Sequence, residues 1–318
     1  MLQIKNLSTS YFQGGATVPA VRDVSMTIEK GRATALVGES GSGKSTVALS
    51  VMRMIRPPIG DIVDGEIHVN GRDVTRMSEK QMRSVLRSEI GLVPQDPTTA
   101  LDPLFTIRSQ IVEAMPHTDK GDRDDVIVRL LESLGIVNAR DRLNEHPHQF
   151  SGGMRQRVAM AIALAKQPSV LIADEPTTAL DVTTQIGILR LLDQLRKERD
   201  LATLFITHDV RVARLLCQSV VVMYAGVVVE SGPTGTVFSN PHHPYTRALL
   251  EATSLDVGPR RKLLAIPGSP PSLASLPAGC PFAPRCPSAI DRCRAEMPPT
   301  VQAKHGSSFA CWSPVVAA

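Results

Sequence analysis

The stretch Gly38-Glu-Ser-Gly-Ser-Gly-Lys-Ser45 limits the possible fold of this chain more than any other. It fits the pattern G-x-x-x-x-G-K-[ST], a glycine-rich turn between a strand and a helix that binds phosphate groups. An apolar run typical of a buried strand precedes it (Ala33–Val37), and residues 46–56 are apolar at helical spacing. Backbone N–H groups of such a turn point inward at a helix N-terminus, which favours anions. Lys44 is then expected to reach the β- and γ-phosphates of a nucleotide, and Ser45 to bind Mg²⁺.

The composition excludes several classes of protein. A chain of 318 residues with 42% hydrophobic residues can bury a large core. The net charge of +4 is dispersed and aromatic residues make up only 3%, so we expect no nucleic-acid partner. No apolar run reaches the roughly 18 residues that span a bilayer, and the first residues show no signal peptide. The sequence therefore predicts a cytosolic protein whose five cysteines form no disulfides.

The pattern of apolar residues predicts an α/β protein. We expect strands over residues 2–7, 21–28, 66–71, 90–93, 170–174 and 201–206, and a pair of strands around Gly226. Helical spacing covers residues 106–115 and 122–134, and Ser78-Glu-Lys-Gln81 reads as a capping box. Tyr11 is expected in a loop that links the first two strands, where its ring stacks on adenine or covers the edge of the core.

A second possible phosphate-binding site begins at Ser151. This residue is a natural N-cap for a helix that runs to about Lys166, and Gly152 and Gly153 follow it. A glycine pair costs stability in the first turn of a helix, which suggests that another group approaches the backbone there. An ordinary helix cap is the alternative.

Two acidic residues follow a buried strand near the middle of the chain. Asp174 suits a Mg²⁺ ligand acting by way of water, and Glu175 suits a base that orients an attacking water. His208 lies at the end of the next predicted strand, in the position where parallel strands present residues to a ligand. Solvated acids and a structural histidine are the alternatives.

Beyond about residue 255 the composition changes. Eleven of the 24 prolines lie in residues 255–318, and helical periodicity is lost. We expect a nucleotide-binding domain over residues 1–254, with a helical subdomain at about 96–166, and a proline-rich extension over 255–318.

The extension contains four cysteines with the spacing C-x5-C-x6-C-x17-C: Cys280, Cys286, Cys293 and Cys311. These gaps exceed those of common zinc knuckles, and prolines directly follow Cys280 and Cys286. Four thiolates from one loop-rich segment fit a [4Fe–4S] cluster or a zinc ion, and free thiols remain the other alternative. The fifth, Cys217, is expected to be a small buried apolar residue.

Taken together, these motifs resemble the nucleotide-binding subunits of ABC transporters over residues 1 to about 240. Within that family the sequence is most similar to the dipeptide/oligopeptide importers, on the stretches 150–157, 240–250 and 280–286. Some importers of this branch look similar at the cysteines, which favours a cluster. The resemblance implies a P-loop NTPase fold of the ABC type: a parallel-sheet core, an antiparallel β subdomain and a helical subdomain.

The resemblance also implies roles for individual residues. Lys44, Glu175 and His208 are expected to act in hydrolysis, with Tyr11 stacked on adenine (Phe12 is the alternative). The other residues expected to contact ATP or Mg²⁺ are Gly38, Ser40, Gly41, Ser42, Gly43, Ser45, Thr46, Gln95, Ser151, Gly152, Gly153, Asp174 and Asp181, of which Ser45, Gln95 and Asp174 hold the Mg²⁺. The family signature Leu-Ser-Gly-Gly-Gln is altered, because Phe150 and Met154 replace its first and last residues.

The function implied by the resemblance is ATP-driven import of di- or oligopeptides. The expected partners are a second ABC ATPase subunit, two membrane permease subunits and an extracytoplasmic substrate-binding protein. The second ATPase subunit is expected to be a different chain, so that the two cassettes form a heterodimer. The protein is then peripheral, on the cytoplasmic face of the membrane. Import of another small solute such as a nickel chelate, or a soluble ABC ATPase without a transport role, are the alternatives, and the extension could also act as a sensor that gates the ATPase.

Overall fold

Two sheets and a group of helices make up the computed structural model, which describes residues 1–116, 122–177, 182–253 and 266–315. The larger sheet has the order β11-β12-β10-β9-β3-β8-β7-β6, and its central strands β9, β3, β8, β7 and β6 are parallel. Its strands are β3 (Ala33–Val37), β6 (Ile90–Val93), β7 (Val170–Asp174), β8 (Ala202–Thr207), β9 (Ser219–Tyr224), β10 (Val227–Pro233), β11 (Val301–Gln302) and β12 (Ser308–Phe309). Strands β3, β7 and β8 are buried along nearly their whole length, as their continuous apolar runs predict.

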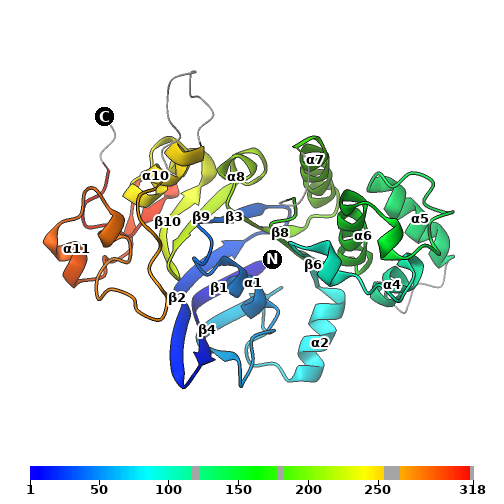
Figure 1. Cartoon of the computed structure of the whole chain (residues 1–318), viewed down its shortest axis with the longest axis horizontal. Helices are drawn as coiled ribbons and strands as arrows, with labels where there is room; N and C mark the ends of the chain where they lie inside the picture. Colours follow the sequence, from blue (N-terminus) through cyan, green and yellow to red (C-terminus); the bar gives the residue numbers. More distant parts are fainter. Residues whose placement is uncertain (117–121, 178–181, 254–265, 316–318) are drawn as a thin grey trace.

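The second sheet is antiparallel, with the order β2-β1-β4-β5. It comprises β1 (Leu2–Gln13), β2 (Ala16–Ile28), β4 (Gly60–Val69) and β5 (Arg72–Asp73). One side of this sheet packs on α1 (Lys44–Val51) through a core that includes Leu2, Val24 and Val47. In Figure 1 this antiparallel sheet lies below the central strands of the large sheet.

The prediction that Tyr11 lies in a loop between the first two strands is wrong. β1 continues through Tyr11 to Gln13, and only Gly14 and Gly15 form the turn to β2. Both glycines have positive φ, 57° and 80°, which suits a two-residue hairpin turn and lets the strands pair to their ends.

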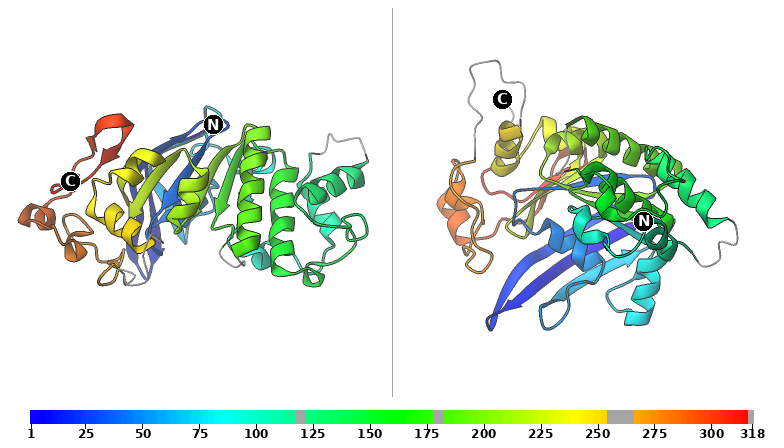
Figure 2. Two further views of the ribbon diagram at one scale, coloured as in Figure 1. Left: turned by 90° about the horizontal axis from the view of Figure 1, so that it is seen from above. Right: turned by 45° about the vertical axis from the view of Figure 1, so that its right-hand side comes forward.

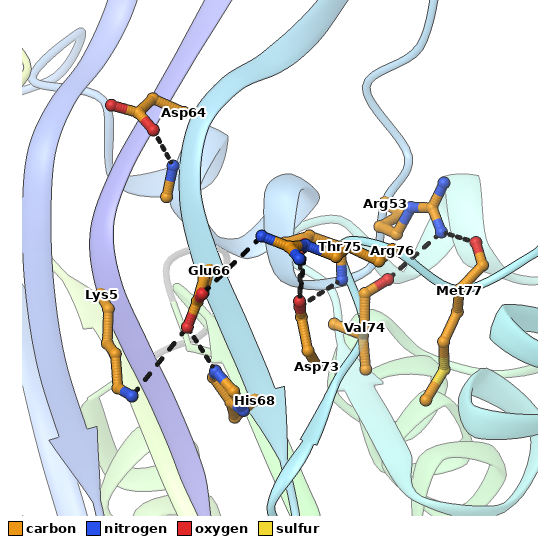
Figure 3. Close-up of polar contacts among 11 residues, drawn as sticks. Lys5, Arg53, Asp64, Glu66, His68, Asp73, Val74, Thr75, Arg76 and Met77 are labelled. Carbon is orange, nitrogen blue, oxygen red and sulfur yellow. Dashed lines mark hydrogen bonds and ion pairs between the residues drawn. The ribbon is translucent and has the colours of Figure 1, made fainter.

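The helix after the phosphate loop is shorter than its apolar spacing predicts. It ends at Val51, and Arg53 adopts a left-handed conformation with φ 51°, a common way to stop a helix. The Arg53 guanidinium then donates to the carbonyls of Val74 and Met77, which ties this helix end to the antiparallel subdomain (Figure 3). In the same view Glu66 accepts from His68 at 2.9 Å.

The remaining helices lie on both sides of the large sheet and at its ends. They are α2 (Glu79–Ser88), α3 (Pro97–Ala100), α4 (Ile107–Ala114), α5 (Arg123–Ser133), α6 (Gly152–Ala165), α7 (Val182–Glu198), α8 (Val210–Leu216), α9 (Thr234–Ser239), α10 (Pro244–Thr253) and α11 (Asp291–Ala295). Ser78 caps α2 in the expected capping box. Helices α4 and α5 lie at one end of the molecule and α11 at the other, and Figure 2 shows the same separation from above.

The C-terminal extension is packed onto the cassette rather than hanging from it. Strand β12 pairs with β10, and Cys280, Phe282 and Cys293 belong to the same hydrophobic core as β3 and β9. The sequence predicts little core for this segment, because its irregular backbone shows no apolar period.

Candidate functional site

The phosphate loop forms a tight turn at the N-terminus of α1. Gly43 is the N-cap residue with φ 100°, and a Cβ there would lie 2.5 Å from the carbonyl oxygen of Ala20, so only glycine fits. The Lys44 ammonium donates to the carbonyls of Gly38 at 2.9 Å and Glu39 at 2.8 Å. The lysine is thus folded back over the loop, next to the N–H groups that an anion would approach.

Burial lowers the pKa of Lys44, and the carboxylates of Glu175, Asp174 and Glu39 oppose that shift. Lys44 begins α1, which follows β3, whereas Asp174 is the last residue of β7 and Glu175 comes directly after it; β7 lies two strands away from β3 in the parallel sheet. Cation and anions therefore converge at one edge of the sheet, as its topology requires.

Asp174 and Ser45 offer oxygen ligands for a cation. Burial raises the pKa of Asp174, and the Ser45 hydroxyl beside it works in the opposite direction. The Oδ1 atom of Asp174 is buried and has no hydrogen-bond partner among the described residues. A hard cation such as Mg²⁺ would satisfy this orphaned oxygen, so the residues present fit the expected metal.

Glu175 is the centre of a three-residue cluster. Gln95 Nε2 donates to its Oε2 at 3.1 Å, and His208 Nδ1 lies 3.0 Å from its Oε1. The backbone of Glu175 has φ 44°, an uncommon value for a residue with a side chain and one that is found at functional sites. The structure thus brings together three residues that the sequence predicts separately.

The aromatic residue expected to meet the base lies beside the same loop. Tyr11 Oη is 3.5 Å from Thr46 Oγ1, whereas the side chain of Phe12 is 42% exposed. Of the two alternatives, Tyr11 is the one that contacts the phosphate-loop helix.

Ser151 caps α6 as expected, with its hydroxyl accepting from the N–H of Met154 at 3.3 Å. A Cβ on Gly152 would meet no atom within 4 Å, so the first turn of α6 is open to an approaching group. No hydrogen bond among the described residues joins Ser151 or Gly153 to the phosphate loop. These residues form a separate feature within one copy of the chain. Asp181 lies outside the described residues.

Gln156 has a structural role that sequence reasoning did not assign. Its side chain is buried, and Nε2 donates to the carbonyl of Pro94, the residue before Gln95. This contact fixes α6 to the strand end that holds Gln95. The only signal in the sequence is its position in the stretch 150–157.

Tyr245 and Arg285 are two further residues without an assigned role, and both contact Glu39 in the phosphate loop. They lie in the two stretches, 240–250 and 280–286, that carry the resemblance to peptide importers. No local pattern could have linked either stretch to residue 39.

The four cysteines of the extension are all free thiols that lie near one another. Cys280 donates its N–H to the Cys293 carbonyl at 2.8 Å, and both side chains are buried. The pKa of Cys311 is raised to about 12, chiefly by burial and also by the neighbouring Cys280, Cys286 and Cys293. In the described residues, no three His, Cys, Asp or Glu side chains are grouped to hold a single metal ion. This arrangement gives no support to either metal alternative, the zinc ion or the [4Fe–4S] cluster. As expected, Cys217 is buried, and burial raises its pKa to about 12.

Comparisons with known proteins agree with this geometry. A family model described as "ABC transporter" matches residues 21–178, and one described as "Oligopeptide/dipeptide transporter, C-terminal region" matches residues 229–293. A putative peptide import ATP-binding protein of Brucella ovis is 44% identical, over 100% of this chain and 98% of its own length. The chain belongs to the ATP-binding subunits of the oligopeptide/dipeptide ABC transporters.

Other ABC transporter proteins are also similar to the chain in sequence or in structure. The dipeptide transport ATP-binding protein DppD of Bacillus subtilis is 41% identical, with 98% of this chain and 94% of DppD covered. A dimeric bacterial ABC transporter cassette, MJ0796, superposes with a TM-score of 0.65 at 28% identity, over 74% of this chain and 99% of the cassette. The fold is thus that of an ABC cassette, with its mixed sheet and antiparallel subdomain. The part of the chain that the structure describes holds no helix able to cross a bilayer.

Proposed function

We propose that the chain hydrolyses ATP between two closed cassettes and thereby drives the import of di- or oligopeptides through a membrane permease. The observation that carries this proposal is the convergence of Lys44, Asp174 and Glu175 at one edge of the parallel sheet. Phosphoryl transfer needs mainly positioned charges, and these side chains supply a cation, a metal ligand and a base within one site.

Lys44 would leave the loop carbonyls and bind the β- and γ-phosphates of ATP. Ser45 and Asp174, the latter by way of water, would hold a Mg²⁺ with Gln95, and the metal would neutralise the charge that develops on the phosphates. The N–H groups of residues 41–46 would wrap the phosphates at the N-terminus of α1, with Ser40 and Ser42 flanking them. Tyr11 would stack on the adenine ring beside Thr46.

Glu175 would orient and polarise the attacking water. Gln95 and His208 hold its two carboxylate oxygens, which fixes the direction from which the carboxylate accepts a proton. His208 would also contact the γ-phosphate once ATP is bound. Its side chain is 58% exposed, so an approaching phosphate can reach it.

A second cassette would complete the site. Ser151, Gly152 and Gly153 form an open helix start that would bind the γ-phosphate of ATP held by the partner, and Asp181 would contact the facing subunit. We propose a partner of different sequence, two permease subunits and an extracytoplasmic substrate-binding protein. The chain would then lie on the cytoplasmic face of the cell membrane.

We also propose that Cys280, Cys286, Cys293 and Cys311 hold a [4Fe–4S] cluster. Four free thiols in one loop-rich segment match the donor set of such a cluster, and a four-iron cube keeps its thiolates further apart than one ion does. Two lie on turns stiffened by the following proline, Pro281 and Pro287. The cluster would hold the extension together.

Transport is tested by reconstituting the complex in vesicles with its permease, partner cassette and binding protein. We expect uptake of radiolabelled di- or oligopeptides that requires ATP and is lost with Glu175→Gln. ATP hydrolysis without peptide uptake, or uptake of nickel chelates alone, would contradict the proposed cargo.

The cluster is tested by purification without oxygen, followed by iron and sulfide analysis. We expect about four irons per chain and absorption near ~400 nm, both lost when two of the cysteines are replaced by serine. A colourless protein without iron, or one with stoichiometric zinc, would refute the cluster and leave the transport proposal intact.

A further inference from the structure

Among the described residues, the hydrogen bonds and ion pairs that link the C-terminal region (from residue 240 onward) to the phosphate loop all reach one loop residue, Glu39. The Arg285 guanidinium forms a bidentate ion pair with its carboxylate, with Nη1 to Oε2 at 2.6 Å and Nη2 to Oε1 at 3.0 Å. The Tyr245 hydroxyl accepts from the N–H of Glu39 at 2.8 Å. The Glu39 carbonyl accepts from Lys44 at 2.8 Å. The N–H, the carbonyl and the side chain of Glu39 therefore all form hydrogen bonds.

Groups other than Glu39 also hold the Arg285 guanidinium in place. Its side chain is only 5% exposed. It donates to the carbonyl of Pro267 at 2.8 Å, to that of Ile266 at 3.1 Å and to the Tyr224 hydroxyl at 3.1 Å. A guanidinium fixed on several sides loses little further freedom when it pairs with a carboxylate, so the pair is well positioned.

An aromatic cluster supports both contacts. The rings of Tyr224 and Tyr245 are 4.6 Å apart, and Phe282 packs against them at 5.2 and 5.3 Å. Tyr224 ends β9 of the cassette, Tyr245 is the second residue of α10, and Phe282 belongs to the extension. The cluster therefore joins the cassette and the C-terminal region, and its Tyr245 contacts the phosphate loop at Glu39.

The ion pair has an electrostatic consequence for the ATP site. Glu39 lies close enough to Lys44 to influence its pKa. An unpaired carboxylate at this position would repel a triphosphate, because two like charges at short range in a partly buried site are poorly screened. Pairing with Arg285 cancels that charge, while Tyr245 fixes the loop backbone.

We propose that Arg285 and Tyr245 are positioning residues for the phosphate loop. Through Glu39 they hold the loop backbone in place and neutralise the one acidic side chain within the stretch Gly38–Ser45. The C-terminal region thereby takes part in ATP binding without touching the nucleotide. This inference concerns the ATP site alone and does not depend on the identity of the cargo or on a cluster.

The test is the equilibrium dissociation constant of a fluorescent ATP analogue for the full chain. Arg285→Gln leaves the charge of Glu39 uncancelled, and we expect binding to weaken by about tenfold, because this carboxylate then repels the nearby triphosphate. Tyr245→Phe keeps the ring but removes the hydrogen-bond acceptor, and we expect a smaller loss. Arg292→Gln is the matched control, because Arg292 lies in α11, pairs with Glu296 and stacks on Trp312.

A charge-removal cycle separates positioning from simple loss of stability. The double variant Glu39→Gln/Arg285→Gln carries no unpaired charge, and we expect it to bind the analogue more tightly than Arg285→Gln does. If Arg285 has a purely structural role, the double variant should bind the analogue no more tightly than Arg285→Gln does, and its Tm should be lower. Equal dissociation constants for wild type and Arg285→Gln would overturn the proposal. If Arg285→Gln does not fold, Arg285→Lys keeps the charge without the bidentate geometry and should show an intermediate affinity; wild-type affinity in that variant would also overturn it.

Discussion

The Nδ1 atom of His208 lies 3.0 Å from Oε1 of Glu175, although 33 positions separate the two residues in the chain. Gln95 donates to the other carboxylate oxygen of Glu175 from a third strand end. A carboxylate held on both oxygens has one orientation, which is what a base needs if it is to accept a proton from a positioned water.

Replacing Glu175 by Gln should therefore reduce the rate of ATP hydrolysis by roughly 10²–10⁴-fold, the usual contribution of a general base. ATP binding should persist, because the phosphate loop is intact. Single-turnover hydrolysis and nucleotide retention measure the two effects. Glu251→Gln on the exposed face of α10 serves as the control, and unchanged turnover of Glu175→Gln would contradict the assigned role.

Asp174→Asn should weaken Mg²⁺ binding and at the same time stabilise the nucleotide-free fold. Burial raises the pKa of Asp174, so the folded state binds its proton more tightly than the unfolded state does. The carboxylate thus destabilises the fold increasingly as pH rises from the unfolded value near 3.8 through the raised folded value. The asparagine lacks that cost. Thermal unfolding at pH 7 without nucleotide should show a higher Tm for Asp174→Asn, while Mg²⁺ titration should show weaker binding.

The same shift predicts how Mg²⁺ binding depends on pH in the wild type. Protonation of Asp174 begins at a higher pH than for an ordinary aspartate, so Mg²⁺ affinity should fall on acidification at a higher pH than it would at a site built on an unshifted aspartate. Calorimetric titrations over a pH series would measure this. An identical pH profile in wild type and Asp174→Asn would show that another group controls the metal.

Ser151→Ala tests the helix start proposed to face a partner. Loss of an N-cap hydroxyl costs about 1 kcal/mol of stability. Thr106→Ala is a matched control, because Thr106 caps α4 in the same way, accepting from the N–H of Ser109 at 3.3 Å. Both variants should lose similar stability in urea, but only Ser151→Ala should impair ATP-driven association in a Glu175→Gln background. Size-exclusion chromatography with ATP measures that association, and equal behaviour of the two variants would argue for an ordinary cap.

The C-terminal region should lose stability in acid because of His243. Complete burial lowers the pKa of this histidine to about 3, whereas the unfolded chain titrates at about 6.5. Between these values the unfolded state binds a proton that the folded state does not, so stability falls by about 1.4 kcal/mol per pH unit below pH 6.5. His243→Asn can still accept from the N–H of Tyr245 but cannot titrate, and its stability should depend less on pH. The fluorescence of Trp312, the only tryptophan, reports unfolding of this region.

Much of the cassette could be predicted from the sequence because its signals are local. The phosphate loop, the caps at Ser78 and Ser151, and the buried strands that end at Asp174 and Thr207 each occupy a short stretch whose residue types define the backbone. The prediction was wrong where a local signal was ambiguous. The Gly14-Gly15 pair reads equally well as part of a long loop or as a two-residue hairpin, and only pairing of the flanking strands distinguishes them.

Motif spacing along the chain is enough to predict the class of site: a triphosphate loop, a metal-binding acid and a base. The distant residues that contact these groups become visible in the folded chain. Arg285 reaches Glu39 across 246 positions, and β12 joins the sheet beside β10. Such contacts depend on how two buried surfaces fit together. The periodicity of a sequence indicates which residues are buried, but it does not indicate which other residues they pack against.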